Sequence, residues 1–265
     1  MRVTGLAASV LFLLAGPAFA QGGTEVTPPV PHVGWSFDGV FGSYDRAALQ
    51  RGFQVYNEVC SNCHSMKELY YRNLTGGNSS GGAGGTGIGL SAEQVVAIAA
   101  SKTVDGGTDD SGQPVTRPGL PSDHFKSPFP NDKAARAANG GALPPDQSLI
   151  AKARDDGPNY IHALLLGYKD APPGLTVPPG QYYNEYFPGH LLAMPQPLHD
   201  DQVEYADGTK ATVDQMSRDV VQFLTWAANP ELETRHRMGI KIILFLVLMT
   251  GLTIAVKRRI WKDAH

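Results

Sequence analysis

The chain has 265 residues and a formal net charge of −3, and its two cysteines are too few for the disulfide framework of a small secreted scaffold. The near-neutral total hides an uneven distribution, because residues 21–234 carry 14 Lys and Arg against 24 Asp and Glu, a net charge of −10. A domain this acidic repels nucleic acid and attracts basic proteins, so we expect no nucleic-acid partner.

The first twenty residues have the three parts of a secretory signal peptide. Arg2 supplies the positive start, residues 6–14 form an apolar stretch, and Ala18-Phe19-Ala20 is a small-residue cleavage site before Gln21. The apolar run is short for a membrane span, which favours cleavage over an uncleaved anchor. We therefore expect residues 1–20 to be removed and residues 21–234 to form an exported domain.

The exported domain is rich in glycine and proline and shows little strand-like alternation, so we expect helices joined by long loops. Ser43 and Asp45 can open a first helix, along which apolar side chains recur at helical spacing as far as Cys60. Further helical signals are a capping box ahead of 95–100 (Ser91-x-x-Gln94), a short helix from Pro145 to Arg154, one from Pro158 to Gly167, and one from Thr212 to Pro230.

Two segments of the exported domain lack a regular pattern. Residues 76–89 are rich in glycine, a composition typical of a mobile surface loop. The sequence indicates no function for this loop. Residues 171–197 combine repeated prolines with several tyrosines, so we expect this loop to lie against an apolar surface.

A long apolar run occupies the C-terminal end. Met238–Val256 is interrupted only by Lys241, and as a helix it would be about 28 Å long, close to the thickness of a bilayer's hydrocarbon core. Both flanks are basic, so charge alone does not orient the run, whereas the signal peptide does. We expect residues 235–265 to form a single-pass anchor, with the large domain on the periplasmic side and a short basic tail in the cytoplasm.

Both cysteines lie in the motif Cys60-Ser-Asn-Cys63-His64, which has the spacing that attaches one c-type haem covalently. Each thiol adds to one vinyl group, and the adjacent histidine can bind the iron through a neutral imidazole nitrogen. A thioredoxin-like redox pair also uses C-x-x-C. That alternative has no use for the histidine, and no βαβ pattern surrounds the site.

A haem that only carries electrons needs a second axial ligand. Met194 lies in the proline-bounded segment Ala193-Met194-Pro195-Gln196-Pro197, where restricted backbone freedom helps to hold a thioether at a fixed place. His190, four residues earlier, is the main competitor. Residue chemistry favours Met194, because a thioether raises the reduction potential of the iron.

These features resemble those of the cytochrome c1 family, the c-type haem subunit of ubiquinol–cytochrome c oxidoreductase, also called the cytochrome bc1 complex. The matching stretches run nearly end to end after the signal peptide. The most specific are residues 51–66 around the haem motif, the run A-R-A-A-N-G-G-A-L-P-P-D at 135–146, Ala193-Met194-Pro195, and F-L-T-W-A-A-N-P-E at 223–231. Some bacterial relatives carry an extra cysteine pair that this chain lacks.

The resemblance implies a mainly α fold, with a class I cytochrome c-like haem domain, long loop insertions and one C-terminal transmembrane helix. It also implies that His64 and Met194 are the axial ligands and that Arg154, with Tyr160 nearby, contacts a haem propionate. The residues expected to line the haem pocket are Asn139, Leu143 and Pro145.

The resemblance further implies the role of the chain in a respiratory or photosynthetic chain. A Rieske iron–sulfur protein, reduced by quinol at cytochrome b, would deliver electrons to the haem, which would pass them to a basic cytochrome c. The chain itself would bind no quinol, would perform only outer-sphere electron transfer, and would belong to a complex that we expect to be dimeric. Two alternatives remain: a free-standing, membrane-anchored c-type electron shuttle, and a haem enzyme or gas sensor with an open iron position.

Overall fold

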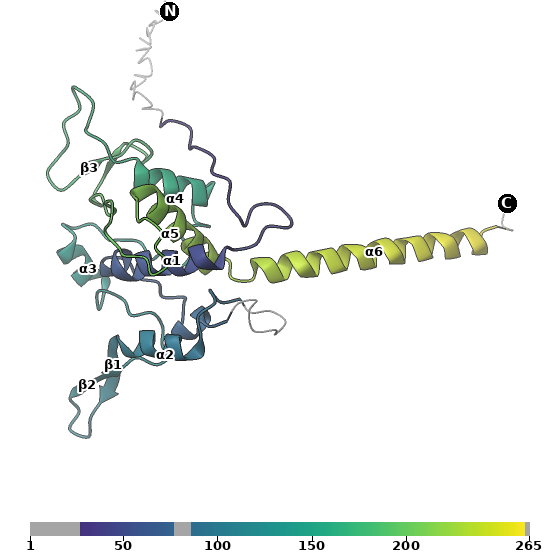
Figure 1. The fold of residues 1–265 in the computed structure, drawn as a ribbon, viewed down its shortest axis with the longest axis horizontal. Helices are drawn as coiled ribbons and strands as arrows, with labels where there is room; N and C mark the ends of the chain where they lie inside the picture. Colours follow the sequence, from purple (N-terminus) through teal and green to yellow (C-terminus); the bar gives the residue numbers. More distant parts are fainter. Residues whose placement is uncertain (1–26, 77–85, 263–265) are drawn as a thin grey trace, which may run out of the picture.

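The structure is a computed structural model that describes residues 27–76 and 86–262. The expected signal peptide and most of the glycine-rich loop lie outside the described residues. Figure 1 shows a head built mainly from helices, with one long helix projecting from it. The expectation of a mainly α fold is therefore confirmed.

Helices α1 (Arg46–Glu58) and α5 (Val213–Ala228) pack against each other at the centre of the head. Both begin where the sequence predicts, because side-chain oxygens satisfy the free N–H groups of their first turns. The Asp45 carboxylate accepts hydrogen bonds from the backbone N–H groups of Ala47 and Ala48, and the Thr212 hydroxyl accepts one from that of Gln215. The aromatic rings of Phe53, Tyr56, Phe125, Phe223 and Trp226 fill the core around this packing.

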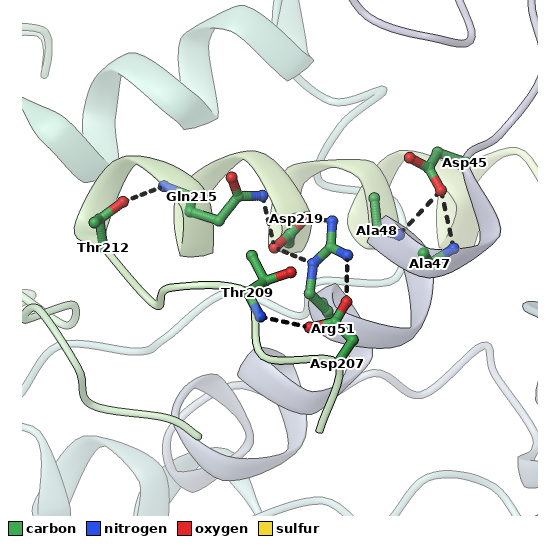
Figure 2. A network of polar contacts seen from close by, with 9 residues as sticks. All are labelled: Asp45, Ala47, Ala48, Arg51, Asp207, Thr209, Thr212, Gln215 and Asp219. Atoms are coloured by element: carbon green, nitrogen blue, oxygen red, sulfur yellow. Dashed lines mark hydrogen bonds and ion pairs between the residues drawn. The ribbon is translucent and has the colours of Figure 1, made fainter. Parts of the chain in front are cut away.

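A polar network also joins the two central helices (Figure 2). Arg51 on α1 donates from Nε to Asp219 Oδ2 at 2.9 Å and from Nη2 to Asp219 Oδ1 at 3.0 Å. Its Nη1 reaches Asp207 Oδ2 in the preceding loop at 2.8 Å. The Gln215 amide adds a third hydrogen bond to Asp219, whose side chain is only 1% exposed. A buried carboxylate is thus fully hydrogen bonded, as it must be inside a protein.

Smaller elements surround this centre. Helix α4 (Gly157–Leu166) packs against α5, and the short helices η1 (Cys60–Asn62), η2 (Tyr71–Leu74), α2 (Ala92–Ala100) and α3 (Asp132–Ala138) lie in the connecting segments. Strands β1 (Thr103–Thr108) and β2 (Pro114–Pro118) form an antiparallel hairpin that projects from the head beyond α2, and β3 (Tyr182–Tyr183) pairs with β4 (Leu191–Leu192). The capping box of α2 and the end of α4 at Gly167 agree with the sequence analysis.

One expected helix is wrong. The segment from Pro145 to Arg154 forms a series of turns rather than a helix. The reason lies in its polar groups, which bond to a distant part of the chain. The Gln147 N–H donates to Ser65 O at 2.8 Å, and the Asp146 carboxylate binds residues 65 and 67.

Helix α6 (Leu232–Ile260) has 29 residues and is about 43 Å long. Within the described part of the chain it is the helix that is long and apolar enough to cross a membrane, and the side chains of its apolar run are exposed. Its base is fixed to the head by Glu233, which accepts a hydrogen bond from the Tyr44 N–H at 2.8 Å and pairs with Arg46 at 2.5 Å.

Candidate functional site

The two cysteines lie immediately after α1. That helix ends at Glu58, and the chain turns through η1, which leaves Cys60 partly buried and Cys63 exposed. Burial, with a smaller effect of Cys63, raises the pKa of the Cys60 thiol to about 12. A catalytic dithiol requires a lowered thiol pKa, so this environment does not favour the thioredoxin-like alternative.

His64 follows the second cysteine and is nearly buried. Its Nδ1 lies 2.8 Å from the carbonyl oxygen of Pro145. Because a carbonyl only accepts hydrogen bonds, Nδ1 carries the proton and the lone pair is on Nε2. Burial lowers the pKa of His64 although the Pro145 bond and Asp146 oppose this effect. The ring is therefore a neutral imidazole with its tautomer fixed, which is the form that binds a metal.

Asp146 holds the segment after His64 against the segment that contains Pro145. Its Oδ2 accepts hydrogen bonds from Ser65 Oγ at 2.7 Å and from the Lys67 N–H at 2.9 Å, and its Oδ1 accepts one from the Ser148 N–H at 2.9 Å. Burial opposes ionisation, but the hydrogen bonds from Ser148, Lys67 and Ser65 hold the pKa of Asp146 below its ordinary value. Sequence reasoning missed this role, since the partners lie about 80 positions away.

Met194 and His190 occupy different environments. Met194 follows β4, is partly exposed, and has its backbone oxygen held by the Tyr168 hydroxyl at 3.0 Å. His190 is buried, stacks on Tyr183 and has its Nδ1 3.1 Å from Asn184 O. Its backbone φ of +59° is in the left-handed region, which is uncommon for a residue other than glycine. His190 thus takes part in the internal packing of its loop, whereas Met194 is positioned through its backbone.

The other expected contact residues lie in a continuous stretch of chain. Arg154 is exposed. Burial raises the pKa of Tyr160, and the nearby charge of Arg154 partly offsets that rise, so the two side chains lie close together. Arg154 also lines a cavity of about 360 Å³ together with Pro145. Asn139 ends α3 and donates from Nδ2 to Ala135 O, and the Leu143 side chain is 37% exposed.

The structure therefore places His64 against Pro145, and Pro145 and Arg154 line one cavity. Met194 lies in a separate segment after β4, where the Tyr168 hydroxyl, just past the end of α4, donates to its backbone oxygen. The contact of Tyr168 with the Met194 backbone is one that the sequence pattern did not reveal. The side chains available are two thiols, one neutral imidazole and one thioether, a set that fits a c-type haem.

Comparisons with known proteins agree with this chemistry. A model of the cytochrome C1 family matches residues 35–264. Cytochrome c1 of Rhodospirillum rubrum is 46% identical over 275 residues, which cover 97% of this chain and 96% of the relative. Cytochrome c1, heme protein, mitochondrial, of Saccharomyces cerevisiae is 46% identical over 232 residues, covering 87% and 72%. Cytochrome b/c1 of Bradyrhizobium diazoefficiens is 44% identical over 98% of this chain, which spans 39% of that relative.

The family match includes both the Cys60-x-x-Cys63-His64 motif and the whole of α6. The chain belongs to the cytochrome c1 family, the haem subunits of the cytochrome bc1 complex, with one haem c attached through Cys60 and Cys63.

Proposed function

We propose that the chain takes electrons from a Rieske iron–sulfur protein and passes them to a cytochrome c, as the electron-transfer subunit of a quinol–cytochrome c oxidoreductase. The observation that carries this proposal is the state of His64, a neutral imidazole whose Nδ1 is fixed on Pro145 O beside two cysteines spaced for haem attachment. This arrangement prepares a permanent iron ligand rather than an acid–base group.

We assign His64 and Met194 as the axial ligands. Tyr168 supports this choice, because it fixes the backbone at Met194, while His190 is engaged with Asn184 and Tyr183. Arg154 and Tyr160 are assigned to a propionate, since a guanidinium pairs well with a carboxylate. Asn139, Leu143 and Pro145 are assigned to the wall of the haem pocket.

Haem c supplies an iron that alternates between the ferric and ferrous states. The chain's own residues keep the two ligands in place during that change. The carbonyl of Pro145 restricts rotation of the His64 ring, and the Asp146 hydrogen bonds hold the segment after His64 against the segment that contains Pro145. A site that does not rearrange on electron transfer suits fast one-electron exchange, and two such ligands would leave the iron no open position for a gas or a substrate.

The optical spectrum tests the ligand assignment. The purified protein should give a c-type pyridine haemochrome, and its ferric form should show a far-red sulfur-to-iron band. Met194→Leu should abolish that band, whereas the matched variant His190→Asn should keep it. The opposite pattern would make His190 the ligand, and carbon monoxide binding by the reduced wild type would favour an enzyme or a sensor.

Membrane topology and partners form the second part of the proposal. We infer that α6 is a single membrane anchor, with the acidic domain in the periplasm and the C-terminus in the cytoplasm. The relative named cytochrome b/c1 supports a permanent partner in cytochrome b. Co-purification of cytochrome b with the full chain tests this, since a free-standing shuttle would purify alone.

The acidic surface is proposed to attract a basic cytochrome c. Asp105 and Asp110 lie exposed on the β1–β2 hairpin and its turn, whereas Glu233 is occupied by Arg46 and the Tyr44 N–H. Asp105→Asn with Asp110→Asn should therefore slow oxidation by a basic cytochrome c at low salt and leave the rate at high salt unchanged. If the salt dependence is unaltered, the hairpin has no part in docking.

A further inference from the structure

An exposed apolar turn lies beside the base of α6. Gly42 N donates to Gly39 O at 3.2 Å and closes a four-residue turn, with Val40 and Phe41 at its tip. The two tip residues are 70% and 82% exposed. Turn tips are usually occupied by Gly, Asn, Asp or Ser, so two large apolar side chains there require an explanation.

The turn is firmly held at its own base. The Ser43 N–H donates to Ser36 O at 2.9 Å, and the rings of Phe37 and Tyr44 on either side of the turn pack together with centroids 5.6 Å apart. A Cβ added at Gly42 would lie 2.2 Å from Phe37 O, so only glycine fits this close approach. The exposed tip therefore belongs to an ordered turn.

The base of the turn also contacts α6. His236 Nδ1 lies 3.1 Å from Gly42 O, and Glu233 accepts from the Tyr44 N–H. In Figure 1 the purple segment before α1 bulges out beside the first turns of α6, on the side toward which that helix projects. His236 precedes the first residue of the apolar run, Met238, by two positions, or about 3 Å along the helix axis. The turn that carries Phe41 thus meets α6 close to the start of the apolar run.

The charges at this level suit a lipid surface. Arg235, Arg237 and Lys241 surround the start of the apolar run on α6, and cations at this depth attract anionic headgroups. Residues 39–43 carry no charge, although the exported domain as a whole is strongly acidic. Aromatic and aliphatic side chains at the level of the headgroups gain free energy by partial insertion into the acyl boundary.

We propose that the tip formed by Val40 and Phe41 inserts into the lipid–water interface beside α6 and gives the exported domain a second contact with the membrane. The proposal rests on the assignment of α6 as a membrane anchor. The second contact would restrict rotation of the head about the anchor, which a single helix does not do.

Fluorescence of the full-length, haem-loaded protein in vesicles of phosphatidylcholine and phosphatidylglycerol tests the proposal. Cys60 and Cys63 are consumed by the haem, so an NBD label can be placed at Phe41→Cys. The matched control is Val115→Cys, an exposed apolar position on the β2 strand away from α6, and the anchor control is Leu246→Cys. The label at 41 should shift its emission to shorter wavelength and lose intensity with lipids spin-labelled near the headgroup, unlike the label at 115.

Each other outcome overturns the proposal in a distinguishable way. If the label at 41 behaves like that at 115 while the label at 246 is quenched by lipid, the turn does not insert and the anchor assignment stands. If the label at 246 is also in water, both the anchor and the insertion are wrong. If the label at 41 is shielded only after reconstitution with cytochrome b, the turn contacts a protein instead of lipid.

Discussion

Removing Arg51 should destabilise the head far more than removing its exposed partner. The Asp219 carboxylate is 1% exposed and receives two hydrogen bonds from the Arg51 guanidinium (Figure 2). Arg51→Met would leave that charge buried, with only the Gln215 amide and whatever water can reach it. Loss of one partner from a buried ion pair costs about 3–5 kcal/mol. Because Gln215 remains, we expect the lower end, about 3 kcal/mol.

The matched control is Asp207→Asn, which removes the other carboxylate bound by Arg51. The Asp207 side chain is 44% exposed, so its pair is screened by water and should contribute less than about 1 kcal/mol. For a domain of this size, 3 kcal/mol corresponds to a fall in Tm of about 6–12 °C.

Far-UV circular dichroism of the haem-loaded full chain in detergent measures both variants during heating. A further variant, Arg51→Met with Asp219→Asn, removes the buried charge itself and should recover part of the lost stability. The reasoning is refuted if Arg51→Met and Asp207→Asn shift Tm equally, or if the double variant is less stable than Arg51→Met alone.

Three further predictions concern packing, pH and the ligand loop. Gly52→Ala should destabilise the head by about 1–3 kcal/mol or more, since its Cβ would lie 2.0 Å from Asp219 O. Gly34→Ala, also in the head but with nothing within 4 Å, should be nearly neutral in urea titrations. Burial lowers the pKa of His162, so at mildly acidic pH the folded state binds fewer protons than the unfolded chain. The free energy of unfolding should therefore fall as the pH drops below about 6.5. His162→Asn should make the free energy of unfolding less dependent on pH between about pH 7.5 and 5.5. Tyr168→Phe removes the hydrogen bond to Met194 O, so the far-red band should weaken at a lower temperature than in wild type; an unchanged melting of the band would exclude a positioning role.

The parts of the fold that could be predicted from sequence are those determined by near neighbours. Asp45, Ser91 and Thr212 each cap a helix within three residues, so the caps are visible as local patterns and the helices begin as expected. The haem motif and the apolar run of α6 are likewise formed by consecutive residues, so they can be recognised directly. In each case the interaction that defines the element spans about one helical turn or one contiguous segment.

The parts that could not be predicted depend on distant partners. Pro145 and Asp146 have the signals of a helix start, yet their carbonyl and carboxylate bind His64, Ser65 and Lys67 instead. The β1–β2 hairpin has no buried face, so it lacks the alternation by which a strand is detected. Its turn is formed by Asp109, which accepts hydrogen bonds from the N–H groups of Ser111 and Gln113.

The two proposed ligands are positioned by a common physical device, although they lie 130 positions apart in the chain. For His64 the ring nitrogen bonds to a distant backbone carbonyl, and for Met194 a distant hydroxyl bonds to the residue's own carbonyl. In both cases the fixed point is a backbone oxygen at or beside a proline. For His64 it is the oxygen of Pro145, which follows Pro144, and for Met194 it is the residue's own oxygen, which precedes Pro195. Because proline restricts the backbone torsions, neither fixed point can move far when the charge on the iron changes. In this proposal the rigidity that one-electron transfer requires comes from the loops that hold the ligands, while α1 and α5 form the packed centre of the head.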